Sequence, residues 1–154
     1  MTMNSSMEKL QIMKGVSSRA GSCVITIGNF DGVHEGHRVL FATALEKARQ
    51  LQLPAGVFTF HPHPAQIIRP DRPFLRLFSY EDQRQLVQNF GFQFLIEEPF
   101  TSELSRLRAE DFFEKYILAP LNPKVIVVGY DFGFGSNREG SIEVLKNRLY
   151  FIPL

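Results

Sequence analysis

The sequence lacks the features of secreted, membrane-spanning and strongly nucleic-acid-binding proteins. It has one cysteine, Cys23, which excludes an internal disulfide and any structural zinc site built from several thiolates. Its 17 basic and 16 acidic residues give a net charge of +1, so no overall positive field attracts nucleic acid or an acidic membrane. No apolar run is long enough for a signal peptide or a bilayer-spanning helix. These absences predict a cytoplasmic protein without nucleic-acid or membrane partners.

What is present is typical of one globular domain. The chain has 154 residues, of which 44% are hydrophobic, 12% aromatic and 21% charged, enough to bury a core. We expect residues 1–20 to be partly flexible and residues 21–154 to form the domain. No internal repeat or interdomain linker interrupts it.

Hydrophobic periodicity predicts alternating strands and helices. The expected strands are 22–28, 55–60, 92–97 and 124–129, and the expected helices are 36–53, 79–90, 109–118 and 141–149. In the first helix the apolar face is predicted to consist of Val39, Leu40, Ala44, Leu45, Ala48 and Leu51. Residues 61–73, rich in proline and arginine, are predicted to be a long loop. Such alternation favours a parallel sheet with helices on both faces and right-handed crossovers.

Two loops are candidates for a ligand site. Residues 28–36 and 129–140 are rich in glycine, and each follows a predicted strand. In parallel sheets, ligands bind beyond the carboxyl ends of the strands. We therefore expect these two loops to face one crevice.

The first loop reads Gly-Asn-Phe-Asp-Gly-Val-His-Glu-Gly-His over residues 28–37. Its two histidines, His34 and His37, stand where the loop becomes a helix, and unpaired backbone N–H groups at a helix start favour phosphate. Its glycines allow the backbone to turn and approach a ligand. A zinc-binding His-x-x-His pair is the alternative, although no third ligand stands nearby in the sequence.

These residues resemble a known family. The string over residues 28–37 is similar to the signature of the adenylyltransferase domain of bacterial FAD synthetases, which belong to the nucleotidyltransferases. The resemblance continues in Thr-Phe-His-Pro-His-Pro over residues 59–64 and in Val-Val-Gly-Tyr-Asp-Phe-Gly-Phe-Gly over residues 127–135. It covers about residues 22–148 and implies a Rossmann-like nucleotidyltransferase domain.

The resemblance also implies a reaction and a set of site residues. The reaction is transfer of AMP from MgATP to the phosphate of FMN, which gives FAD and pyrophosphate. His34 and His37 are then the catalytic residues, and Mg²⁺ is held mainly by the ATP phosphates and water rather than by protein ligands. The implied FMN-binding residues are Pro62, His63 and Pro64. The implied ATP-binding residues are Gly28, Asn29, Phe30, Asp31, Gly32, Gly36 and Asp131.

Several of these residues also have a purely structural interpretation. Asn29 and Asp31 are typical turn formers, and Asp131 is also suited to capping its own loop. His63 has the alternative of an ordinary loop histidine. Aromatic residues usually pack, which favours the core for Phe132 and Phe134, and a lone loop arginine such as Arg138 is usually solvated.

The sequence departs from the family pattern at three places. Gly133 stands where the family usually has arginine, and His61 where it usually has glutamate. Nothing after Leu149 in the given sequence matches the serine-rich segment and arginine of the family's ATP site, and we expect no riboflavin kinase domain. We therefore expect a C-terminally truncated domain whose sheet lacks a strand, leaving an unpaired edge and an apolar patch around Val127.

Three functions remain open at this point. The first is FMN adenylyltransferase, with this chain alone expected to be a poor or inactive enzyme. The second is a noncatalytic nucleotide or flavin binder with the same fold. The third is an adenylyltransferase for another phosphate acceptor, such as a pantetheine or pyridine nucleotide. The sequence does not fix the oligomeric state.

Overall fold

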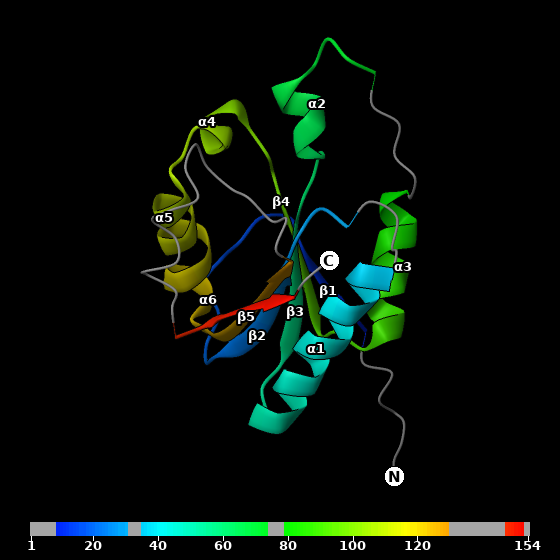
Figure 1. Ribbon diagram of the computed structural model, residues 1–154, viewed down its shortest axis with the longest axis vertical. Helices are drawn as coiled ribbons and strands as arrows, with labels where there is room; N and C mark the ends of the chain where they lie inside the picture. The colour runs from blue at the N-terminus through cyan, green and yellow to red at the C-terminus, as the bar shows by residue number, and fades with distance from the viewer. Residues whose placement is uncertain (1–8, 31–34, 74–78, 130–146, 153–154) are drawn as a thin grey trace.

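The described part of the chain is built around a six-stranded parallel sheet. A computed structural model describes residues 9–30, 35–73, 79–129 and 147–152. The strands lie in the order β1-β4-β3-β2-β5-β6 (Figure 1). Their bounds are β1 (Gln11–Met13), β2 (Cys23–Ile27), β3 (Ala55–Phe60), β4 (Phe94–Glu98), β5 (Pro123–Gly129) and β6 (Leu149–Ile152). The predicted α/β class with a parallel sheet is confirmed.

Helices cover both faces of the sheet. In Figure 1, α1 and α3 lie on one side and α4 to α6 on the other. The helices are α1 (Glu35–Leu51), α2 (Pro64–Ile68), α3 (Tyr80–Phe90), α4 (Ser102–Ser105), α5 (Ala109–Phe112), the π-helical η1 (Phe113–Leu118) and α6 (Ala119–Leu121). None of the helices in the described ranges is both long and apolar enough to cross a membrane.

Side-chain alternation along the strands divides the core into two clusters. The cluster beneath α4 to α6, which we call the aromatic face, contains Phe58, Phe60, Phe94 and Phe112. The cluster beneath α1 and α3, the α1/α3 face, contains smaller strand residues such as Val24, Val57 and Val127. Successive residues of a strand point to opposite faces, so each strand serves both clusters. The sheet is thereby covered on both sides.

The predicted apolar face of α1 is partly wrong. Val39 is 43% exposed and Leu51 is 48% exposed, whereas Phe41, which the pattern left out, is fully buried. Leu40, Ala44 and Ala48 are buried as expected. The buried stripe runs through residues 40, 41, 44 and 48, the spacing of a helix face that includes Phe41.

The segment predicted as a loop over residues 61–73 contains a short helix. α2 begins at Pro64, and the preceding His63 caps it. Proline is favoured at the first helical position because its ring presets φ and its missing N–H needs no partner there. The Pro-His-Pro sequence thus starts a helix as well as forming a turn.

Both edges of the sheet differ from the prediction. β1 was not predicted, and it pairs with β4. β6 begins at Leu149, where the last helix was predicted to end, and it pairs in parallel with β5. Val127 is fully buried, with Ile152 in the same cluster, so the expected apolar patch is absent. The expectation of a missing strand beside β5 was wrong because the last apolar residues extend the sheet.

Candidate active site

The two sequence motifs meet at the carboxyl ends of β2 and β3, which are adjacent parallel strands. The Gly28 amide donates a hydrogen bond to the Phe58 carbonyl at 3.1 Å. Beyond it, Thr59 Oγ1 donates to the Asn29 carbonyl at 3.3 Å. The loop after β2 is therefore hydrogen-bonded to the strand that leads into the Pro-His-Pro segment.

Phe30 is the buried centre of the first loop. Its backbone has φ +50°, in the left-handed region, and its side chain is 1% exposed. A Cβ on Gly28 would lie 2.7 Å from the tip of the Phe30 ring, which is too close for two carbon atoms. This packing requires glycine at position 28, and the assignment of Gly28 to the approach of a ligand stays a prediction.

His37 lies in the first turn of α1, as predicted. Its ring packs edge-on against the Phe30 ring, with centroids 5.3 Å apart and an interplanar angle of 82°. His37 and Gly36 are half-buried, at the end of the helix where backbone N–H groups and the helix dipole favour an anion. The other predicted residues of this motif, Asp31, Gly32 and His34, lie outside the described residues, and so does Asp131.

In the second motif His63 caps α2. Its Nδ1 accepts a hydrogen bond from the Ala65 amide at 3.0 Å. In a neutral imidazole the nitrogen that accepts carries no proton, so the proton lies on Nε2. The His61–Pro62 peptide bond is cis, and Pro62, His63 and Pro64 are all half-buried. The Nδ1 atom of His63 thus has a structural role as the cap of α2. The Nε2–H group is a hydrogen-bond donor of the kind that binds phosphate.

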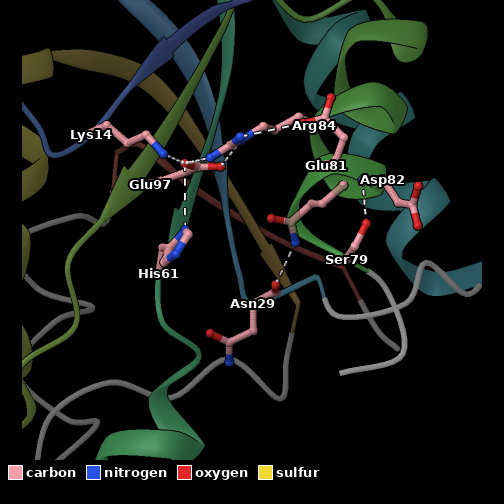
Figure 2. A network of polar contacts seen from close by, with 9 residues as sticks. Lys14, Asn29, His61, Ser79, Glu81, Asp82, Arg84 and Glu97 are labelled. Carbon is pink, nitrogen blue, oxygen red and sulfur yellow. Dashed lines mark hydrogen bonds and ion pairs between the residues drawn. The ribbon is translucent and has the colours of Figure 1, made fainter. Parts of the chain in front are cut away.

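A buried carboxylate, Glu97, lies beside this motif (Figure 2). Arg84 donates to it from Nε and Nη2, each at 2.8 Å. Lys14 Nζ lies 3.1 Å from Oε1, and His61 Nδ1 lies 3.8 Å from the same oxygen. Glu97 therefore ties α3 and the segment after β1 to the residue that precedes the cis peptide bond.

The environment of Glu97 favours its charged form. Burial opposes ionisation, but the hydrogen bonds from Arg84 and Lys14 outweigh it and hold the pKa of Glu97 below its usual value. The neighbouring Glu98 is different, because burial raises its pKa and the single hydrogen bond from the Val16 amide does not compensate. The two adjacent carboxyl groups are thus shifted in opposite directions.

His61 also stacks on an aromatic ring. Its imidazole lies parallel to Tyr80, with centroids 3.7 Å apart and an interplanar angle of 10°. Tyr80 begins α3, whose N-cap Ser79 accepts a hydrogen bond from the Asp82 amide at 3.0 Å. The start of α3 therefore contacts the second motif directly.

Sequence reasoning missed Gln83, which contacts the first motif. Its Nε2 donates to the carbonyls of Asn29, at 3.1 Å, and Phe30, at 2.9 Å. A signal was available, because Gln83 lies four residues before Val87 and seven before Phe90, on the apolar stripe of its helix. A polar residue on such a stripe needs a buried partner. Glu97 gave the same kind of signal at the end of an apolar strand.

Within the described ranges, no three His, Cys, Asp or Glu residues gather as a metal site would require. His34 lies outside these ranges, so the zinc alternative for the pair His34 and His37 is not tested.

The fold and the site define a class. In this parallel α/β sheet, a glycine-containing loop follows the central strand β2 and leads into α1, which has an imidazole in its first turn. This arrangement is typical of Rossmann-like nucleotide-binding domains. The sequence model described as FAD synthetase matches residues 16–150. The chain belongs to the FAD synthetase family.

Curated relatives agree with this assignment. The chain is 35% identical over 124 residues to the bifunctional riboflavin kinase/FMN adenylyltransferase of Escherichia coli K12, covering 80% of this chain and 40% of the relative. It is 30% identical over 135 residues to the protein of the same name from Bacillus subtilis, covering 87% of this chain and 42% of the relative. The chain thus spans less than half the length of these relatives.

A solved structure shares the fold. This structure, described as "Crystal Structure of Macrolide-efflux Protein from Streptococcus pneumoniae", superposes with a TM-score of 0.82 at 28% identity. The match covers 94% of this chain and 51% of that one.

Proposed function

We propose that this chain is an FMN adenylyltransferase, which transfers AMP from MgATP to FMN and releases pyrophosphate. The observation that carries the proposal is the placement of His37 in the first turn of α1, at the end of a loop that follows the central strand β2. The family match and the adenylyltransferase half of the relatives' names support it. We place the reaction in the cytoplasm, where its ATP is available.

The reaction asks for positioning and charge stabilisation more than for covalent chemistry by the protein. An oxygen of the ionised FMN phosphate attacks the α-phosphorus of ATP, and the bond to the bridging oxygen of pyrophosphate breaks. No general base is needed, because the nucleophile is already ionised. When bound to the phosphates, Mg²⁺ neutralises part of their charge. The remaining task is to hold the two phosphates in line.

The described residues divide this task between them. His37 would donate to an oxygen of the α-phosphoryl group or of the leaving pyrophosphate, beside the backbone N–H groups that start α1. His63, with its proton on Nε2, would donate to the FMN phosphate from the neighbouring strand end. His34, Asp31, Gly32 and Asp131 would contact ATP, as the family resemblance implies.

Calorimetric titration of the purified chain with MgATP, followed by an assay of FAD formation from FMN, tests the proposal. We expect binding that weakens when Mg²⁺ is removed, and detectable FAD formation, even at a low rate, that depends on both substrates. A folded chain that gives no heat with MgATP would overturn the nucleotide site. Binding of MgATP without FAD formation would overturn the transferase and leave the noncatalytic binder.

A further inference from the structure

Gln83 has a polar role on a helix face that is otherwise apolar. It lies in the second turn of α3 and is 2% exposed. Its amide nitrogen donates to two successive carbonyls of the loop after β2, those of Asn29 and Phe30. One side chain therefore uses both of its N–H donors on one loop.

The loop needs such an anchor because of its backbone. Phe30 has φ +50°, which is unfavourable for a residue with a Cβ. A strained conformation of this kind persists only where the surrounding contacts determine it. The donors from Gln83, with Thr59 Oγ1 on the Asn29 carbonyl, are the hydrogen bonds that fix the two carbonyls on either side of the Phe30 Cα.

The Phe30 ring links the fixed loop backbone to His37, the candidate catalytic histidine. Since the backbone is fixed, the ring is held against Gly28, edge-on to His37 and 5.1 Å from the Phe41 ring. Gln83 thus reaches His37 through Phe30. Phe30 is the one residue between Gln83 and His37 in this series of contacts, and both Gln83 and Phe30 are buried.

We propose that Gln83 is a positioning residue for the nucleotide site: by holding the Asn29 and Phe30 carbonyls it fixes the Phe30 ring and thereby the orientation of the His37 imidazole. The consequence for nucleotide binding rests on the proposed function, whereas the orientation of His37 does not.

The proposed role of Gln83 requires hydrogen-bond donors at this position, and a set of variants tests this requirement. Gln83→Met keeps the length of the side chain and removes both donors. Gln83→Lys supplies ammonium donors and no acceptor, and Gln83 Oε1 has no hydrogen-bond partner among the described residues, so its loss costs no contact. Gln85→Met is the matched control, because Gln85 is exposed on the same helix and bonds to Asn89 one turn further along.

The first measurement is the imidazole region of the NMR spectrum of the full chain without ligand, with each histidine assigned by its own substitution to glutamine. We expect Gln83→Met to shift or broaden the His37 signals while the His63 signals stay unchanged. Gln83→Lys is expected to restore the His37 signals, and Gln85→Met to leave them as they are. Unchanged His37 signals in a folded Gln83→Met chain would overturn the proposal.

The second measurement is the dissociation constant for MgATP by calorimetry. We expect it to rise about tenfold or more in Gln83→Met, the loss of two hydrogen bonds of ordinary strength, and less than about threefold in Gln83→Lys. If the wild-type chain binds no MgATP, the proposed function fails and the imidazole spectra still decide the role of Gln83. If Gln83→Met does not fold, Gln83→Asn replaces it, because the shorter amide withdraws the donors from the carbonyls while remaining polar.

Discussion

The two faces of the sheet are built from different material. Beneath α4 to α6, the aromatic face is filled by rings, and Phe112 alone contacts Phe58, Phe60 and Tyr116. The α1/α3 face has smaller strand residues and most of the buried polar side chains, namely Thr26, Thr59, Gln83 and Glu97. The exception is Glu98, which strand alternation places toward the aromatic face.

This difference separates stability from function. Ring packing on the aromatic face stabilises the fold through apolar burial and dispersion contacts, and it positions no group at the candidate site. On the α1/α3 face, Thr59 and Gln83 hydrogen-bond to the first motif, and Glu97 lies 3.8 Å from His61 of the second. Changes on the aromatic face are therefore expected to alter only the free energy of unfolding, and changes on the α1/α3 face to alter the site as well as stability. Four predictions test this division.

Phe112→Ala is expected to have the largest effect on stability. Phe112 is fully buried, and removing a buried phenylalanine ring typically costs about 3–5 kcal/mol of unfolding free energy. Urea denaturation measures the loss, with Val39→Ala, at an exposed site of α1, as the control. The molecules that remain folded should bind MgATP as tightly as the wild type. A loss below about 1 kcal/mol would contradict the stabilising role of the aromatic face.

His37→Ala is expected to lower adenylyl transfer by about a hundredfold or more, because it removes a donor to developing charge in the transition state. The ring is only half-buried, so we expect a much smaller effect on unfolding. FAD formation from FMN and MgATP is the measurement, and Arg38→Ala, at the exposed neighbouring position, is the control. Turnover near the wild-type rate would remove His37 from the reaction, and loss of folding would make it a structural residue.

Glu97→Gln is expected to cost about 1–3 kcal/mol at neutral pH, since it weakens charged hydrogen bonds from Arg84 and Lys14. The folded-state pKa of Glu97 is lowered, so its stabilisation is present above the ordinary carboxyl pKa and is lost as the pH falls through the folded value.

Urea denaturation from neutral into acidic pH measures this effect. The difference between wild type and Glu97→Gln should shrink as the pH falls. Glu98→Gln is the matched control with the opposite sign, because the pKa of Glu98 is raised and its contribution is present at low pH and lost as the pH rises. Parallel pH profiles for the two variants would contradict the different environments of the two carboxyl groups.

Ser79→Ala is expected to have the smallest effect, about 1 kcal/mol, through loss of the cap of α3. Thr101→Ala removes the equivalent cap from α4, which packs on the aromatic face, at a similar cost. Because α3 carries Gln83 and Tyr80, only Ser79→Ala should also weaken MgATP binding measurably. Equal effects of both variants on binding would show that the two faces are not separate in function.

The sequence predicted what depends on local signals. The helix predicted over residues 79–90 is α3, whose ends are local features: Ser79 caps its start, and Gly91, with φ +105°, closes it. The parallel direction of the central strands followed from the alternation of strands and helices. The loop after β2 was correctly placed at the carboxyl edge, with His37 in the first turn of the helix.

What the sequence did not predict depends on contacts between distant segments. Glu97 gains its partners from α3 and from the segment after β1, and nothing near Glu97 in the sequence indicates either. β1 and β6 are short edge strands whose existence depends on a neighbour being in place. The face of α1 was misjudged because Val39 and Phe41 are both apolar, and only the packing against the sheet decides between them.

The strand order also bears on how the chain folds. Thr26 is paired with Val57 of β3 on one side and with Val127 of β5 on the other, so one residue joins a near segment of the chain and a remote one. Closing the longer loop costs about 1 kcal/mol more in chain entropy than closing the shorter. We expect β2, β3 and β4 to assemble first, with β5 and β6 docking on one edge afterwards. The pairing of β2 with β5 would then be the last contact between central strands to form. The Thr26 hydroxyl, which donates a hydrogen bond to the Val127 carbonyl at 2.8 Å, joins these two strands.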